Sequence, residues 1–220
     1  LIPELKQNGQ EPSREVSKEM LKSDVILMIT NKSLTHTRAR REATEKGTRI
    51  ISAPGITEDI FNRCVDIDYD PLIKMHEWLR PIISESREIQ VTTERGTNLI
   101  FSVHDTHGYA EHLLKNIKGA FGNLPSGEID SGVLHANGTI VIDGSMAGVG
   151  LLKEPIKLEV KSNYATIISE NQDSLKLKGV LDKFGKEAYQ LAEFGIGTNP
   201  NATLSGIVLE DEKVKGTVHF

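Results

Sequence analysis

Carboxylate and imidazole side chains stand beside glycines at three distant points of the sequence. Glu128 follows the turn segment GNLPSG, Glu193 lies in LAEFGIGTNP, and His219 lies in EDEKVKGTVHF. Turn residues favour non-repetitive backbone, so the carboxylate of Glu128 is either a solvated loop charge or a ligand presented to a site. The intervals between the three residues match no spacing motif. Residue types alone therefore leave their roles open.

A denser group of polar residues lies in HDTHGYAEH. Histidines and carboxylates so close in sequence can ligate a metal. Their spacing differs from recurrent zinc motifs such as H-E-x-x-H on a helix. We therefore favour a polar surface loop over a metal site for this group, which consists of His104, Asp105, His107, Glu111 and His112.

Other segments give weaker signals for chemistry. NKSLTHTRAR follows a predicted strand, where α/β folds bind ligands, but Ser33 and Thr35 also suit helix capping, which we favour. No G-x-G-x-x-G, Walker lysine or G-x-S-x-G elbow occurs.

Cys64 lacks a catalytic signature and is better interpreted as a small buried hydrophobe. The glycines of GTIVIDGSMAGVG indicate tight turns and close packing between strands rather than an anion site.

The composition is that of a globular protein. The chain has 220 residues, a mass of 24.3 kDa, 38% hydrophobic residues, a net charge of −5 and a pI near 5.8. It lacks a basic block, which argues against nucleic acid as a partner. Its apolar runs are too short to span a bilayer, no secretory leader opens it, and its one cysteine cannot form an internal disulfide. We expect a cytoplasmic protein. The start at Leu1 suggests that its natural N-terminus is missing.

The first part of the chain has an α/β pattern. REVSKEMLKS predicts a helix after Ser13, and residues 24–30 form an unbroken β-rich run, as expected of a strand covered on both faces. A helix from a cap at Thr35 to Gly47 and a second strand at 48–55 complete a βαβ unit. Two further helices are predicted at 57–61 and from Pro71, the second broken or kinked near Pro81.

The pattern changes at Glu88. EIQVTT and NLIFSV predict a β-hairpin, and further short strands are expected at GTIVIDG, IKLEV and YATIIS. The segment SLKLKGVLDKFGKEAYQLAEF is expected to be helical. We therefore predict two domains, an α/β N-terminal domain at residues 1–87 and a β-rich α+β domain at residues 88–220.

Four segments of the second part resemble the aminopeptidase T family of metallopeptidases: GNLPSGE, ANGTIVIDGS, LAEFGIGTNPNA and LEDEKVKGTVHF. SLTHTRARREATEKGTRIISAPGIT is similar to the N-terminal domain of its shorter members. The resemblance implies an α/β domain followed by a β-rich domain that builds a two-metal site. It implies that Glu128, Glu193 and His219 are metal ligands. It also implies two divalent ions (zinc, cobalt or manganese) and a homodimer.

The resemblance stops short of a complete site. The family has a Tyr shortly beyond the ligand equivalent to His219, and later a His-x-Asp pair. Phe220 ends the sequence, and no His-x-Asp occurs in it. We therefore expect that the rest of the metal site is missing from this sequence.

The function implied is a metal-dependent aminopeptidase that removes N-terminal residues from short peptides. Two metal ions would bind the substrate's amine, polarise the scissile carbonyl and activate a bridging water. The sequence assigns no residue to acid–base catalysis. One alternative is a ring-cleaving dihydroxypyridine dioxygenase, which resembles the same family and uses iron in a His-His-Asp setting. We favour the peptidase because a single iron needs fewer carboxylates than Glu128 and Glu193 provide. A non-catalytic binding homologue is the second alternative.

Overall fold

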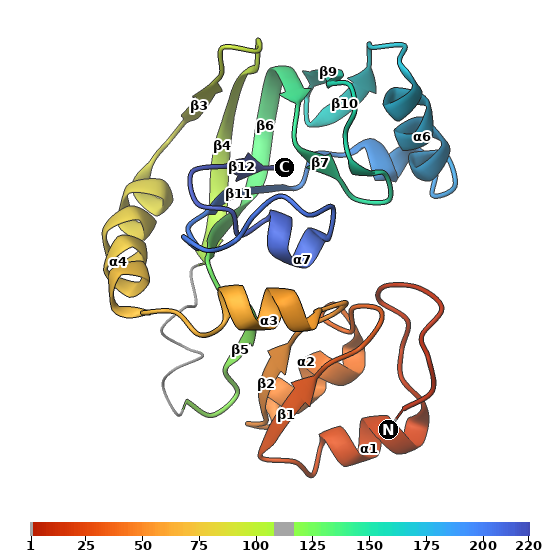
Figure 1. Cartoon of the computed structure of the whole chain (residues 1–220), viewed down its shortest axis with the longest axis vertical. Helices are drawn as coiled ribbons and strands as arrows, with labels where there is room; N and C mark the ends of the chain where they lie inside the picture. Colours follow the sequence, from red (N-terminus) through yellow and green to blue (C-terminus); the bar gives the residue numbers. More distant parts are fainter. Residues whose placement is uncertain (1, 108–116) are drawn as a thin grey trace.

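The structure is a computed structural model that describes residues 2–107 and 117–220. Figure 1 shows a small sheet with its helices at one end of the molecule and a larger antiparallel sheet at the other. Helix α3 (Glu58–Cys64) lies between the two, and helix α4 (Asp70–Glu85) runs beside the larger sheet. The fold is a mixture of α and β structure, as predicted.

The small sheet contains the predicted βαβ unit. Strands β1 (Val25–Met28) and β2 (Arg49–Ser52) pair in parallel, and helix α2 (Arg38–Glu45) connects them. Strand β5 (Phe121–Asn123) pairs in parallel with the other edge of β2. The predicted first helix is α1 (Arg14–Met20), capped by Ser13. Since β5 follows residue 87, this sheet draws on both parts of the chain, and the division at residue 87 stays a prediction.

Two details of this unit differ from the prediction. The cap of α2 is Thr37, whose hydroxyl accepts a hydrogen bond from the backbone N–H of Arg40. The hydroxyl of Thr35 is instead 3.2 Å from that of Ser52. The expectation that β1 is covered on both faces is also wrong. Helices α1 and α2 pack against one face, while Val25 and Leu27 on the other face are 57% and 54% exposed.

Helices α3 and α4 begin close to the residues predicted for their N-termini. Thr57 caps α3 through its hydroxyl, and a proline lies in the first turn of α4. Of the break or kink predicted near Pro81, the break is wrong, because α4 continues through this residue. Pro81 is on the exposed face of the helix, where water can satisfy the carbonyl group that loses its N–H partner.

The larger sheet is built around one long strand, β6 (Glu128–Ile142). Strand β4 (Asn98–His107) pairs with one edge of β6 and forms the predicted hairpin with β3 (Ile89–Thr92). Strands β11 (Glu193–Gly197) and β9 (Ile156–Lys161) share the other edge. The sheet ends at β12 (Val218–His219) beside β11 and at β10 (Tyr164–Ile167) beside β9. Strands β7 (Ser145–Met146) and β8 (Gly150–Leu151) pair separately.

The predicted helical segment before Glu193 is only partly helical. Helix α6 (Gln172–Leu181) and a short 3-10 helix (Lys186–Tyr189) precede β11. Phe194 packs in the core with ring centroids 4.9 Å from Phe101 and 5.6 Å from Phe220. This burial explains why the end of the segment is a strand. None of the helices in the described ranges is long and apolar enough to cross a membrane.

Candidate metal centre

The strands β6 and β11 present one apolar face and one polar face. Their antiparallel register pairs Glu193 with Gly132 and Gly197 with Glu128. Side chains alternate along a strand, so Glu128 and Glu193 lie on the same side of the sheet. On the opposite side, Ile129 is fully buried and Phe194 is in the core. The hydrophobic core therefore fixes the register that brings the two carboxylates onto one face.

His219 joins this face from β12. Its backbone pairs with Gly195 of β11, and its imidazole ring lies against the position that a Cβ atom of residue 195 would occupy. A side chain at residue 195 would therefore collide with the ring. The same arrangement recurs on β6, where the ring of His104 lies over Gly132. Small residues in the strands make room for imidazoles on the polar face.

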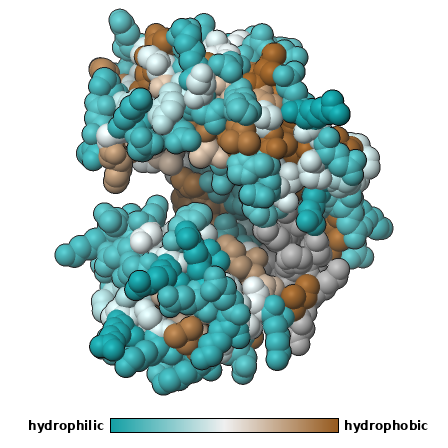
Figure 2. All heavy atoms as spheres, turned by 180° about the vertical axis from the view of Figure 1, so that it is seen from behind, coloured by the Kyte–Doolittle hydropathy of each residue, from teal (hydrophilic) through white to brown (hydrophobic). Residues whose placement is uncertain are grey.

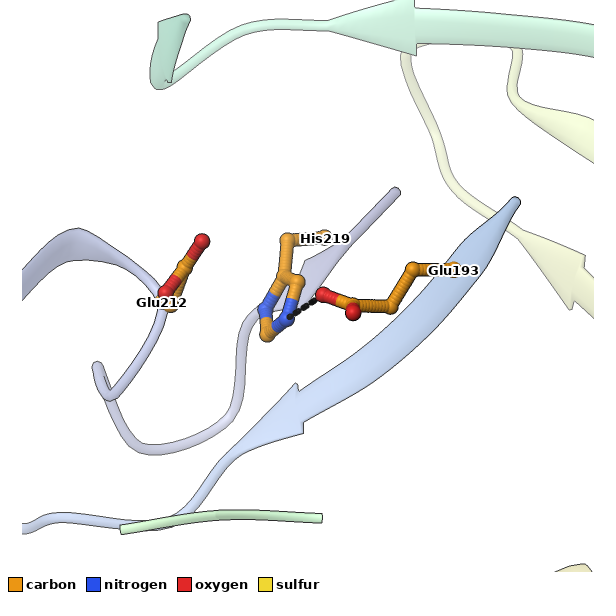
Figure 3. A group of neighbouring side chains, drawn as sticks. All are labelled: Glu193, Glu212 and His219. Carbon is orange, nitrogen blue, oxygen red and sulfur yellow. Dashed lines mark ion pairs between the residues drawn. The ribbon is translucent and has the colours of Figure 1, made fainter. Parts of the chain in front are cut away.

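The three predicted site residues come together. His219 Nε2 is 3.5 Å from Glu128 Oε2 and 3.8 Å from Glu193 Oε1. Figure 3 shows the His219 ring between Glu193 and a further carboxylate, Glu212. One ligand atom from each of Glu193, Glu212 and His219 lies within 4.8 Å of the others. Oxygen and imidazole donors this close can hold a divalent cation.

Glu212 and its neighbour Lys213 were not singled out from the sequence. Both follow the short helix α7 (Val208–Asp211). The ammonium group of Lys213 lies 2.6 Å from Glu128 Oε1 and 3.0 Å from Glu212 Oε2. Its side chain is 1% exposed. In the sequence, these two residues are marked only by the acidic run from Glu210 to Glu212 and the lysine that follows it. This pattern does not indicate which of the side chains points toward the site.

A network of hydrogen bonds holds the segments that carry these groups. The side-chain amide of Asn199 donates to the carbonyl oxygens of Ser126 and Cys64. Its backbone N–H donates to the carbonyl of Lys213 at 2.8 Å. Asn199 therefore joins the turn before Glu128, helix α3 and the Lys213 segment.

An ion pair anchors the same region to α3. Arg63 Nη1 lies 2.8 Å from Glu210 Oε1, and the side chain of Glu210 is fully buried. The same oxygen of Glu210 accepts a hydrogen bond from the backbone N–H of Thr203. Asp211 accepts from the backbone N–H groups of Ser205 and Gly206. Two carboxylates of the acidic run therefore fix the loop, and Glu212 is left to face the site.

Burial and charge set the protonation of the cluster. Burial raises the pKa of Glu128, and the positive charge of Lys213 opposes this effect. Burial alone would lower the pKa of Lys213, but the charges of Glu128 and Glu212 outweigh it and raise this pKa above its ordinary value. Burial lowers the pKa of His219, which favours the neutral imidazole that metals require. Burial also raises the pKa of Glu193.

The polar segment HDTHGYAEH is only partly a loop. His104, Asp105 and His107 belong to strand β4, while Glu111 and His112 lie outside the described residues. His107 Nδ1 is 3.2 Å from Asp130 Oδ2, and the charge of His107 affects the pKa of Glu193. This segment therefore lies close to the candidate metal cluster of Glu193, Glu212 and His219, although its spacing predicted a surface loop.

The surface is hollowed between the two ends of the molecule. Figure 2 shows a notch between the part that contains the small sheet and the part that contains the large one. Most of the surface in this view is hydrophilic, with scattered hydrophobic patches.

Comparisons with known proteins identify relatives of this fold. A structure of 2,5-dihydroxypyridine dioxygenase from Pseudomonas putida KT2440 is 19% identical, with a TM-score of 0.70. The match covers 86% of this chain and 55% of that one. Wild-type AmpT from Thermus thermophilus is 14% identical, with a TM-score of 0.58, over 91% of this chain and 63% of that one. No curated protein matches the sequence. The chain thus spans 55% of the length of the dioxygenase structure and 63% of the length of the AmpT structure.

The assignment to the aminopeptidase T family was wrong. A family model described as NicX, 2,5-dihydroxypyridine 5,6-dioxygenase, matches residues 4–219. The likeness to AmpT is a likeness of fold. The segments that suggested the peptidase contain Gly127 and Gly195, which the fold requires because Asn199 and His219 pack against them. Glycines of this kind indicate a shared backbone arrangement. Enzymes that catalyse different reactions can have the same backbone arrangement.

The peptidase function and the peptide substrates inferred with it are corrected as well. On the sequence alone, the number of carboxylates favours a peptidase over an iron enzyme. In the structure, Lys213 neutralises Glu128, so the presence of this glutamate does not require a second metal ion. The implied homodimer stays a prediction. From the match over nearly its whole length, the chain belongs to the NicX family, described as 2,5-dihydroxypyridine 5,6-dioxygenase.

Proposed function

We propose that this protein is an iron(II)-dependent dioxygenase that opens the ring of a dihydroxypyridine or a closely related hydroxylated aromatic compound. The match of the family model to residues 4–219 carries this proposal. The fold likeness to the Pseudomonas dioxygenase supports it. In such a reaction both atoms of dioxygen are added to the substrate as the ring opens.

The side chains of the cluster fit an iron(II) ion. Imidazole and carboxylate donors with open positions are typical of non-haem iron oxygenases, whose usual set is two histidines and one carboxylate. Within the described residues, His219 supplies one imidazole, and Glu193 and Glu212 supply two carboxylates. We propose these three as the residues that hold the metal, with Glu128 next to them. A bound ferrous ion would supply the electron transfer that activates dioxygen.

Side chains of the protein set the protonation state and the orientation of the groups at this site. The lowered pKa of His219 keeps its ring neutral and able to bind a metal at neutral pH. Hydrogen bonds from Lys213 fix the carboxylates of Glu128 and Glu212. His107, held by Asp130, stands on the neighbouring strand β4. Its imidazole is a candidate hydrogen-bond partner for a hydroxyl group of the substrate.

Oxygen consumption tests the proposal. Metal-free protein is loaded with ferrous iron under anaerobic conditions and mixed with 2,5-dihydroxypyridine and oxygen. We expect oxygen uptake equal to the substrate consumed, and mass spectrometry should find two labelled atoms in the product formed under ¹⁸O₂. His219→Gln should abolish uptake, whereas His135→Gln, an exposed position outside the cluster, should leave it unchanged.

Two results would contradict the proposal. One is the absence of oxygen uptake with dihydroxypyridines and with catechols in iron-loaded protein. The other is hydrolysis of aminoacyl reporter substrates at a rate that does not depend on oxygen.

A further inference from the structure

Lys213 is the most deeply buried charged group beside the cluster. We propose that Lys213 is a positioning residue whose ammonium group acts as a permanent counter-ion to Glu128 and Glu212 and thereby restricts the cluster to one divalent cation. This inference rests on the proposed function for the identity of the metal site. It concerns the chain's own residues, and it can be tested without substrate or oxygen.

The geometry gives the ammonium group a fixed place between two carboxylates. Lys213 Nζ binds Glu128 Oε1 at 2.6 Å and Glu212 Oε2 at 3.0 Å. A cation shared by two carboxylates is also the arrangement that a metal ion would adopt there. The ammonium group is attached to the chain, so it cannot exchange with ions in solution. It therefore occupies the space and the ligand atoms that a second metal ion would need.

The charges of the cluster support the same stoichiometry. Glu128, Glu193 and Glu212 carry three negative charges when ionised, and Lys213 carries one positive charge. The two remaining negative charges match one divalent cation. The carboxylate of Asp130 lies nearby, with its Oδ2 atom 3.2 Å from His107 Nδ1, and it makes no ion-pair contact with Lys213 among the described residues. A second divalent ion would leave an excess of positive charge beside the ammonium group of Lys213, which is itself buried, and the like charges would repel each other.

The backbone around Lys213 is also held in place. Its carbonyl accepts a hydrogen bond from Asn199, and its own N–H donates to the carbonyl of Glu210. Glu210 is in turn paired with Arg63 of α3. The ammonium group is thus placed by the same contacts that fix the loop, which is what a positioning role requires.

Metal titration of the metal-free, full-length protein tests this inference. Manganese(II) is the probe, followed by isothermal titration calorimetry and by the electron paramagnetic resonance spectrum of the bound ions. We expect one ion per chain and a mononuclear spectrum in the wild type. Lys213→Met should bind two ions with a spin-coupled spectrum. Lys213→Arg should bind one, and the exposed neighbour Lys215→Met should match the wild type.

A second set of variants gives a result if Lys213→Met does not fold. Glu128→Gln leaves Lys213 free to compete for Glu212, so it should bind one ion about 10- to 100-fold more weakly, a typical loss when a partner of a metal ligand is removed. The double variant Glu128→Gln/Lys213→Met removes both charges. It should still bind one ion and recover affinity to within a few fold of the wild type. A lysine that only stabilises the fold would not produce this recovery.

Several outcomes would overturn the inference: two ions in the wild type, no bound ion, unchanged binding in folded Lys213→Met, or no recovery in the double variant. Failure of the proposed function looks different. If the stoichiometries agree with expectation but the iron-loaded protein consumes no oxygen, the dioxygenase proposal fails while the role of Lys213 stands.

Discussion

The imidazole ring of His219 lies against the α-carbon of Gly195 in the neighbouring strand, where any Cβ atom would collide with it. The position of this candidate ligand therefore depends on the absence of a side chain in β11. The relationship links a glycine, which has no reactive side chain, to the candidate metal cluster.

Gly195→Ala should displace the His219 ring and weaken manganese(II) binding at least tenfold, a loss within the range found when the support of a metal ligand is removed. Calorimetric titration of the metal-free protein measures this. The control is Gly179→Ala in α6, where an added Cβ meets no atom within 4 Å and alanine favours the helix. Equal metal affinity in Gly195→Ala and wild type would show that the ring is not held as the structure indicates.

Glu193→Gln should also weaken metal binding, because it removes a charged oxygen donor while keeping the shape of the side chain. We expect a loss of tenfold or more in manganese(II) affinity and a corresponding loss of oxygen uptake at limiting iron. Glu170→Gln, on the exposed segment before α6, is the matched control and should change neither quantity. Retention of full affinity in Glu193→Gln would remove this residue from the ligand set.

The ion pair between Arg63 and Glu210 should contribute strongly to stability. Glu210 is fully buried, so Arg63→Met leaves its charge without its 2.8 Å partner. Breaking a buried pair in this way costs about 3 kcal/mol of unfolding free energy. Urea denaturation measures the change. Arg38→Met breaks an exposed pair with Glu42, and its effect should be below about 1 kcal/mol. Similar values for the two variants would contradict the structural importance of the Arg63 contact.

Cys64 gives an expectation for the dependence of stability on pH. Burial, together with the charge of Glu210, raises the pKa of its thiol from 9.0 to about 11. Below pH 9 the thiol is protonated in both the folded and the unfolded chain, so it adds no pH dependence. Between pH 9 and 11 the unfolded chain releases the proton first, and the folded state loses stability as the pH rises.

Urea denaturation of wild type and Cys64→Ala at pH 8, 9 and 10 checks this expectation. The loss of the side chain shifts the stability of the variant by a constant amount, whereas the thiol's contribution appears as a difference that changes with pH. The wild type should lose stability relative to Cys64→Ala above pH 9. A constant difference across this range would show that the thiol has an ordinary pKa in the folded protein.

Much of the local structure could be predicted from the sequence. The parallel βαβ unit, the β3–β4 hairpin and the caps at Ser13 and Thr57 depend on nearby residues, whose pattern and turn chemistry are visible in the chain. The sequence-based predictions were wrong where contacts between residues far apart in the chain determine the local structure. Phe194 is drawn into a strand by Phe101 and Phe220, although its own segment has helical character. Tertiary burial outweighs local preference of this kind.

The sequence by itself determined that Glu128, Glu193 and His219 each stand beside glycines or turns, and so that each can be presented on an irregular or closely packed backbone. Only the tertiary structure decided that they meet, because their meeting depends on the register of β6, β11 and β12 across long intervals of chain. It also brought in Glu212 and placed Lys213 against Glu128. Charge pairing between residues so far apart leaves no pattern in a single sequence, since it arises only when the sheet and the loop after α7 are packed together.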